Sequence, residues 1–244
     1  MSTEPSSNPS AAQGRRIIVA IDGPAGAGKS TVARELARHF GLLNLESGAM
    51  YRAFALKALR AAQPLDESVA LERLAAETAI CLEPTGEGNR VLLDGEDVTG
   101  LIRNPTVTDA ASRVSVFPAI RAWMVSLQQQ LGAQGGVVME GRDIGTVVFP
   151  RAGVKIFLDA APEVRGQRRY EQMGGPDSTT APPPEEIVRD LRARDERDRN
   201  RADSPLKPAA DSILLDSTHL TLDQVVARAI AIVGAKLQSA GLPS

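Results

Sequence analysis

The most informative motif in the chain is Gly23-Pro24-Ala25-Gly26-Ala27-Gly28-Lys29-Ser30-Thr31, which fits the phosphate-binding pattern G-x-x-x-x-G-K-[ST] in full. Glycines let the backbone approach phosphate closely with N–H groups pointing inward, and a following helix adds the positive end of its dipole. Lys29 offers a charge to the outer phosphates, and Ser30 offers a hydroxyl to Mg²⁺. We expect all nine residues to bind a nucleoside triphosphate.

The sequence on either side supports this interpretation. Residues 17–21 form a short apolar run typical of a buried strand, and residues 30–40 have the spacing of a helix that Gly41 closes. A chance glycine-rich loop would not require a strand before it and a helix after it. The motif leaves the acceptor open, because motors, GTPases, regulatory ATPases and small-molecule kinases all share it.

Strands and helices alternate along most of the chain. Further strands are expected at 137–139, 154–158 and 213–215, and helices at 50–61, 65–78, 109–131 (interrupted at Phe117-Pro118), 162–173, 185–201 and 222–237. This order predicts an α/β protein of the P-loop NTPase class, with a parallel sheet flanked by helices.

One region departs from the alternation. Short strands at 80–82 and 90–93, followed by the turn Asp94-Gly95, predict a local hairpin. We interpret residues 64–104 as a small inserted subdomain within a P-loop domain spanning 15–240, and Cys81 as a buried strand residue. Residues 1–14 are rich in Ser, Pro and Ala and are expected to be a disordered tail.

Composition narrows the class of protein. The 244 residues are 43% hydrophobic and 24% charged, which is typical of a globular protein. The net charge of −2 argues against a general nucleic-acid binder. A single cysteine allows no internal disulfide and no zinc cluster. No apolar run is long enough to span a membrane, so we expect a cytoplasmic protein.

A charged helix is expected over residues 185–201. It carries six arginines, six acidic residues and no lysine. A solvated helix with many ion pairs is one interpretation, but planar arginines also suit bidentate binding of phosphate. Arg194, Asp198 and Arg201 share one face. The Pro- and Gly-rich loop at 174–184 leads into this helix, so we predict a mobile lid over about 168–195 that excludes water.

Two further segments place polar residues near a ligand. Arg142 and Asp143 follow the strand at 137–139, and ligands of open α/β sheets bind at the carboxyl ends of strands. The alternative is a turn closed by a local Arg142–Asp143 pair. Ser47 is either the N-cap of the second helix or a ligand-binding residue, and Arg52 lies one turn further on.

The chain resembles the bacterial cytidylate kinases, a group of nucleoside monophosphate kinases, over residues 17–236. The matching segments are 23–31, Glu46-Ser47-Gly48-Ala49-Met50-Tyr51-Arg52, 93–99 with Ile102-Arg103, Ala111-Ser112-Arg113-Val114, Phe117-Pro118-Ala119-Ile120-Arg121, 141–150, 155–160 and 194–201. The resemblance implies ATP as donor, Mg²⁺ as cofactor, CMP or dCMP as acceptor, an inserted NMP-binding region at about 64–104, and a monomer.

The resemblance also implies a role for each site residue. Ser112, Arg121 and Asp143 would read cytosine, since Asp143 can accept from its amino group while the other two donate to its ring acceptors. Arg194 and Asp198 would hold the sugar, and Ser47, Arg52, Arg142 and Arg201 the acceptor phosphate. The catalytic set would be Lys29, Arg142, Arg194 and Arg201, with Ser30 as a magnesium ligand.

Two other functions stay open at this stage. A different small-molecule kinase on the same fold is opposed by the set of Ser112, Arg121 and Asp143. A nucleotide switch protein would need a guanine-reading motif, and the sequence contains no Asn-Lys-x-Asp element.

No strong general base is required, because the acceptor phosphate is already ionised at neutral pH, with a second pKa of about 6.

Overall fold

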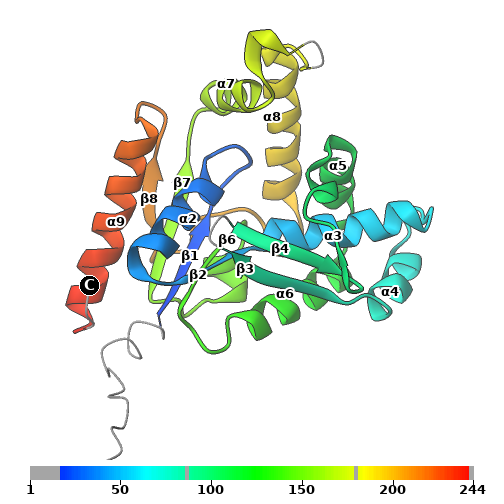
Figure 1. Ribbon diagram of the computed structural model, residues 1–244, viewed down its shortest axis with the longest axis horizontal. Helices are drawn as coiled ribbons and strands as arrows, with labels where there is room; N and C mark the ends of the chain where they lie inside the picture. Colours follow the sequence, from blue (N-terminus) through cyan, green and yellow to red (C-terminus); the bar gives the residue numbers. More distant parts are fainter. Residues whose placement is uncertain (1–16, 86–87, 179–180, 242–244) are drawn as a thin grey trace, which may run out of the picture.

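The computed structural model describes residues 17–85, 88–178 and 181–241, so the tail predicted at 1–14 lies outside the described residues (Figure 1). The strands are β1 (Ile18–Asp22), β2 (Leu43–Glu46), β3 (Ile80–Thr85), β4 (Gly88–Leu93), β5 (Glu96–Asp97), β6 (Val137–Gly141), β7 (Val154–Asp159) and β8 (Ile213–Asp216). The helices are α2 (Lys29–Phe40), α3 (Ser47–Arg60), α4 (Ser68–Ala76), α5 (Pro105–Val114), α6 (Pro118–Leu131), α7 (Pro162–Gln172), α8 (Pro184–Asn200) and α9 (Leu222–Ser239).

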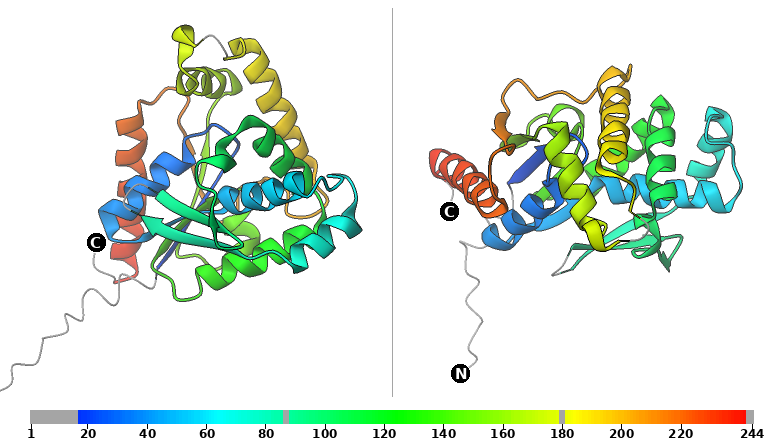
Figure 2. Two further views of the ribbon diagram at one scale, coloured as in Figure 1. Left: turned by 45° about the vertical axis from the view of Figure 1, so that its right-hand side comes forward. Right: turned by 90° about the horizontal axis from the view of Figure 1, so that it is seen from above.

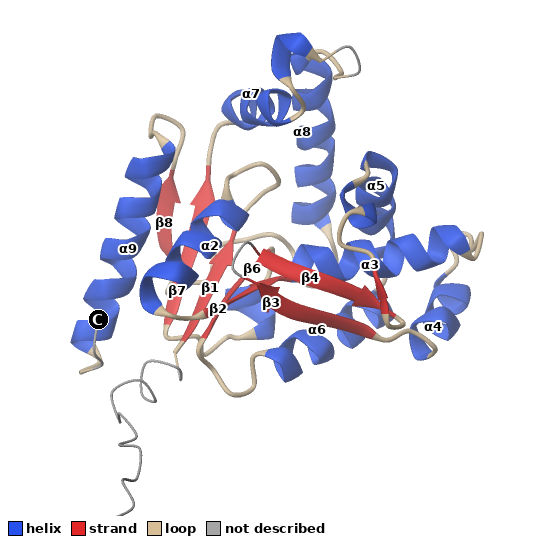
Figure 3. Cartoon of the chain, viewed as in Figure 1, coloured by secondary structure: helices blue, strands red, loops and turns tan. Residues whose placement is uncertain are grey.

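The main sheet has five strands in the order β2-β6-β1-β7-β8, and every neighbouring pair is parallel. Helices lie on both of its sides (Figure 3). This confirms the predicted α/β class with a parallel sheet flanked by helices. Its central strands are apolar and β-branched, as expected for strands that are buried on both faces.

Alternating side chains divide the core into two layers. Val19 and Ile21 of β1 pack with the apolar faces of α2 and α9, whereas Ala20 packs with α3, α5 and α6 on the opposite face. The same alternation separates Val138 of β6 from its neighbours. Because successive side chains of a strand point to opposite faces, a five-residue apolar strand serves both layers.

A second sheet contains three short antiparallel strands in the order β3-β4-β5. Its buried side chains, among them Leu82 and Val91, join the hydrophobic cluster of α3 and α5. The prediction that Cys81 is buried was wrong, because Cys81 is exposed. Strand alternation explains the error: Leu82 faces the core, so its neighbour points outward.

Some element boundaries also differ from the predictions. Strand β2 was missed, because its four residues alternate polar and apolar at the edge of the sheet. Helix α3 begins at Ser47 rather than at residue 50, and α4 ends two residues earlier than expected. The Pro- and Gly-rich loop at 174–184 contains a 3₁₀ turn at Gly175–Asp177. The interruption at Phe117-Pro118 is confirmed, since it separates α5 from α6.

Helices α7 and α8 lie beyond the carboxyl ends of β1 and β7 (Figures 1 and 2). Helix α8 runs beside α5, and Arg197 of α8 lies 3.7 Å from the carboxylate of Asp109. The loop between β1 and α2 also lies at the carboxyl ends of these strands, on the side of α7 and α8. Among the described residues, no helix combines the length and apolar character needed to cross a membrane.

Candidate active site

The phosphate-binding loop takes a conformation that requires glycine at its ends. Gly23 has φ of 149°, and a Cβ there would lie 1.9 Å from the carbonyl oxygen of Leu158. Gly28 has φ of 94° and forms the left-handed N-cap of α2. A side chain at either position would strain the backbone, so the loop places its N–H groups at the start of a twelve-residue helix.

Lys29 and Ser30 begin α2 and meet a carboxylate from β6. Lys29 Nζ donates to the carbonyl of Pro24 over 2.8 Å and lies 4.0 Å from Glu140 Oε2. Ser30 Oγ donates to Glu140 Oε1 over 2.8 Å. Ser30 and Glu140 each place an oxygen atom beside the phosphate loop, and oxygen atoms are the ligands that a magnesium ion prefers.

Burial acts on Lys29 and Glu140 in opposite directions. It lowers the pKa of Lys29, and the nearby charge of Arg142 lowers it further, while Glu140 opposes the change. Burial raises the pKa of Glu140, and Lys29 opposes that change. Both shifts disfavour the charged forms of the two side chains. A phosphate beside Lys29 would favour its ammonium form.

Asp198 of α8 joins two arginines from different segments. Arg142 Nε donates to Asp198 Oδ2 over 2.9 Å, and Arg201 lies 3.6 Å from Asp198 Oδ1. Burial opposes ionisation of Asp198, but the charges of Arg142 and Arg201 outweigh it and lower its pKa. The alternative of a local Arg142–Asp143 pair is wrong, because Arg142 pairs with Asp198.

Arg194 adds a further charge to the same cluster. Burial, followed by the neighbouring charge of Arg142, lowers the pKa of Arg194 to about 10. Arg52 pairs with Glu46 at the start of α3. Ser47 is not an N-cap, since Glu46 holds that position and the Ser47 hydroxyl donates to the carbonyl of Glu140 over 2.7 Å.

A buried ion pair joins Arg121 of α6 to Asp143, which follows β6. Arg121 also donates to the carbonyl of Ser115 over 3.2 Å and lies 5.8 Å from the ring centre of Tyr51. The hydroxyl of Ser112 is buried nearby. Ser112, Arg121 and Asp143 therefore line the same cleft, and such a set of polar side chains could bind a small polar ring.

The backbone next to Asp143 is held from β1. Asp22 is buried and accepts hydrogen bonds of 2.7 Å from the N–H groups of Ile144 and Gly145. These residues begin a π-helical turn, Ile144–Val148. Burial raises the pKa of Asp22 to about 6, although the two backbone N–H groups oppose the shift. Asp22 therefore fixes the turn that presents Asp143 to the cleft.

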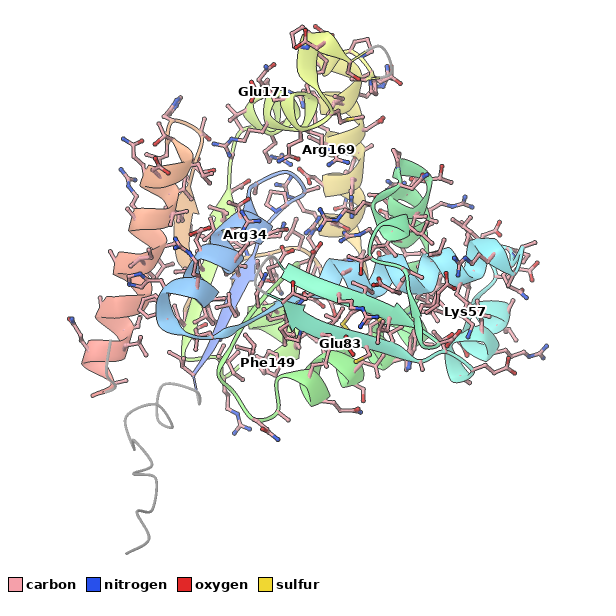
Figure 4. The ribbon with its side chains drawn as sticks, in the orientation of Figure 1. Arg34, Lys57, Glu83, Phe149, Arg169 and Glu171 are labelled. Atoms are coloured by element: carbon pink, nitrogen blue, oxygen red, sulfur yellow. The ribbon has the colours of Figure 1, made fainter. Side chains whose placement is uncertain are left out.

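Apart from Asp22, the charged and polar side chains of these contacts line one cleft of about 730 Å³. It collects every residue predicted to bind the acceptor: Ser47, Arg52, Ser112, Arg121, Arg142, Asp143, Arg194, Asp198 and Arg201. Of the phosphate loop, Ala25, Gly26, Gly28, Lys29, Ser30 and Thr31 line it, whereas Gly23, Pro24 and Ala27 do not. Figure 4 labels two further lining arginines, Arg34 on α2 and Arg169 on α7.

Several buried polar atoms of this cleft have no hydrogen-bond partner within the part of the chain that the structure describes. They are Asn44 Oδ1, Tyr51 Oη, Ser112 Oγ and the Nε atoms of Arg52, Arg121, Arg194 and Arg201. Buried polar atoms are rarely left unpaired in folded proteins. Their concentration in one cleft points to a polar, anionic ligand that would satisfy them.

Sequence reasoning missed three residues of the site, Asp22, Glu140 and Tyr51. Asp22 and Glu140 both end apolar strand runs, at the carboxyl edge where ligands bind, and that position was the available signal. For Tyr51 the only sequence signal was its place in the family-like segment at 46–52. Its ring packs near Arg121, and burial raises its pKa to about 12.

A parallel sheet, a phosphate-binding loop at the end of its central strand and an arginine-lined cleft facing that loop define a P-loop phosphotransferase. Comparison with known proteins identifies the family within this class. The family model "Cytidylate kinase" matches residues 19–235. The chain belongs to the cytidylate kinase family and is an enzyme of the kinase class.

Curated relatives with the name cytidylate kinase cover nearly the whole chain. That of Pelotomaculum thermopropionicum is 49% identical over 89% of this chain and 96% of its own. That of Actinobacillus succinogenes is 46% identical over 90% and 99%, and that of Pasteurella multocida 44% over 89% and 95%.

Proposed function

We propose that this enzyme transfers the γ-phosphoryl group of ATP to CMP or dCMP, giving ADP and CDP or dCDP. The observation that carries the proposal is the cleft itself. Its walls combine residues of the phosphate loop, the buried set of Ser112, Arg121 and Asp143, and further arginines. Membership in the cytidylate kinase family supports the same reaction.

We assign the donor to residues 23–31. The loop N–H groups and the start of α2 would bind the β- and γ-phosphates, and Lys29 would neutralise charge on the transferring group. Lys29 is only 5% exposed, so its charge would act with little screening by solvent.

The donor set fits a magnesium ion. Ser30 Oγ and Glu140 Oε1 are 2.8 Å apart beside the loop, and Mg²⁺ usually takes one or two carboxylates together with phosphate oxygens and water. The described ranges hold no group of three or more His, Cys, Asp or Glu side chains suited to a metal, so phosphates would complete the site. When bound, the ion would neutralise and orient the donor phosphates.

We assign the acceptor to the opposite end of the cleft. Asp143 would accept from the cytosine amino group, while Arg121 and Ser112 would donate to the ring acceptors. Uracil has a carbonyl in place of the amino group and would face the Asp143 carboxylate unpaired, which is costly in a buried site. Arg194 and Asp198 would hold the sugar.

The chemistry requires positioning more than bond activation. Ser47, Arg52, Arg142 and Arg201 would hold the acceptor phosphate so that one of its oxygens attacks the γ-phosphorus in line. The new P–O bond forms as the bond to the β–γ bridging oxygen breaks, and ADP leaves. Arg142, Arg194 and Lys29 would stabilise the charge on the group in transit. The acceptor phosphate is its own nucleophile, so no general base is assigned.

Two organisational features belong to the same proposal. Residues 64–104 would act as the inserted acceptor-binding region and about 168–195 as the lid of a kinase domain spanning 15–240. We further propose that the enzyme acts as a monomer on free nucleotides in the cytoplasm. Size-exclusion chromatography with light scattering tests the oligomeric state.

A coupled ADP-release assay with ATP and magnesium tests the function. CMP, dCMP, UMP, AMP and GMP are offered in parallel, with Lys29→Ala as the inactive control. We expect rates with CMP and dCMP far above those with the other three. Equal low rates with all five would overturn the assignment of the acceptor.

A further inference from the structure

Arg165 of α7 is a fully buried arginine outside the cleft. Arg165 is 1% exposed and its partner Asp195 is 2% exposed, the two lowest values among the charged residues that the structure describes. Burying a guanidinium is costly unless it is paired and hydrogen-bonded. The contacts of the Arg165 guanidinium show what compensates for its burial.

The guanidinium of Arg165 joins three separate segments. Its NH1 donates to the carbonyl of Ala25 in the phosphate loop over 2.9 Å, and its Nε donates to the carbonyl of Ala160 after β7 over 2.8 Å. Its NH2 lies 2.7 Å from Asp195 Oδ2 on α8. The phosphate loop and α8 are thus connected through one planar group.

The contact with the loop is close. A Cβ on Gly26 would lie 3.3 Å from the Cβ of Arg165, so the loop backbone rests directly on α7. Helices α7 and α8 approach each other even more closely, because a Cβ on Gly166 would lie 2.3 Å from Cγ2 of Val188. A displacement of the loop would therefore be passed through α7 to α8 with little slack.

Asp195 stands between the acceptor residues of α8. Arg194 precedes it, and Asp198 follows three positions later, on the part of the helix that lines the cleft. Fixing Asp195 on Arg165 fixes the rotation of α8 about its axis. The other carboxylate oxygen of Asp195 has no hydrogen-bond partner among the described residues, so the pairing of this carboxylate depends on Arg165.

We propose that the Arg165–Asp195 pair is a positioning link that couples occupation of the phosphate loop to the acceptor-binding side of α8. Neither residue touches substrate. Filling of the loop by donor phosphates sets the Ala25 carbonyl, and through Arg165 and Asp195 it sets Arg194 and Asp198. The inference rests on the proposed function, because it assigns the donor to the loop and the acceptor to α8.

The test measures CMP affinity with and without a non-hydrolysable ATP analogue and magnesium, by titration calorimetry. In the wild-type chain we expect the analogue to tighten CMP binding about tenfold, within the usual range of coupling between sites. In Asp195→Asn, which keeps the shape of the side chain but loses its charge, we expect the factor to fall below about threefold. Arg165→Lys should give the same result.

The chain offers a matched control. Arg192 and Glu163 form an exposed ion pair that also joins α8 to α7. Arg192→Gln should keep the wild-type coupling factor, which separates the buried link from a general loosening of the two helices. Melting temperatures of all variants identify loss of the fold.

A measurement on the wild-type chain makes the test independent of the variants. The ATP analogue alone should slow amide hydrogen exchange in residues 194–201 as well as in the phosphate loop. Protection confined to the loop, no coupling in the wild-type chain, or unchanged coupling in folded Asp195→Asn would each overturn the link. Absence of any CMP binding or turnover by the wild-type chain would instead overturn the proposed function.

Discussion

Ser30 Oγ donates a 2.8 Å hydrogen bond to Glu140 Oε1, although the two residues lie 110 positions apart in the chain. The contact forms because β6 is the neighbour of β1 in the sheet, and Glu140 aligns with Ile21 just before the phosphate loop. It places a buried carboxylate beside the residue assigned to magnesium and beside Lys29.

Glu140→Gln should lower kcat about 100-fold, the usual effect of removing one group that stabilises transition-state charge. The amide still accepts from Ser30 but supplies no negative charge for magnesium. Steady-state rates over a magnesium titration measure the effect, and half-maximal activity should require more magnesium. Glu83→Gln, on the exposed face of β3, serves as the control. A wild-type magnesium profile in Glu140→Gln would refute the assignment.

Asp143→Asn should change acceptor choice. The carboxamide can donate to the uracil carbonyl, so kcat/KM for CMP should fall about 100-fold while the preference for CMP over UMP shrinks. Rates with both acceptors measure it.

The same substitution leaves Arg121 buried without a charged partner, so we expect a loss of about 3 kcal/mol in the free energy of unfolding. Asp97→Asn removes an exposed pair with Arg90 and should cost much less, because solvent screens that pair. Urea unfolding compares the two variants, and equal losses would contradict the account of Arg121.

Asp22 should make stability depend on pH. Its pKa rises from 3.8 to about 6 on folding, so between these values the folded chain holds a proton that the unfolded chain releases. The contribution of Asp22 to stability is therefore complete below pH 3.8 and is lost as the pH rises through about 6. The loss amounts to about 3 kcal/mol.

Asp22→Asn does not titrate in this range, so it isolates the effect. Its free energy of unfolding relative to the wild-type chain should rise by about 2.4 kcal/mol between pH 4 and pH 7. Urea unfolding at four pH values provides the measurement. A difference that stays constant with pH would show that Asp22 titrates alike in both states.

Asn89 of β4 should position the acceptor site from a distance. Its Oδ1 accepts from the N–H of Glu46 over 2.9 Å, and its Nδ2 donates to the carbonyl of Asn44 over 2.7 Å. It thus holds edge strand β2 directly before Ser47. Asn89→Ala should raise KM for CMP about tenfold, equivalent to about 1.4 kcal/mol, with kcat nearly unchanged.

The neighbouring Arg90→Gln changes the same strand without touching β2 and is the matched control. A fall in kcat with KM unchanged would indicate that Asn89 acts on the chemical step and not on binding.

The sequence by itself determined the class of fold, the phosphate loop and the family. Each of these depends on residues that are neighbours in the chain: apolar runs, helical spacing and the nine residues from Gly23 to Thr31. Resemblance to a known family added the acceptor residues, and all nine of them line the cleft. Local errors arose where the local signal was weak, as in the four residues of β2, or was misread, as at Cys81, where one residue of an apolar strand faces outward.

Only the tertiary structure decided which charges meet. The sequence placed Arg142 beside Asp143, but the fold pairs Arg142 with Asp198 and Asp143 with Arg121. It also brought Glu140 to Ser30 and Asp195 to Arg165. Such pairs depend on strand order, register and helix rotation, which result from packing of the whole core. Periodicity along the chain carries no information about distances between segments that are separated by tens of residues or more.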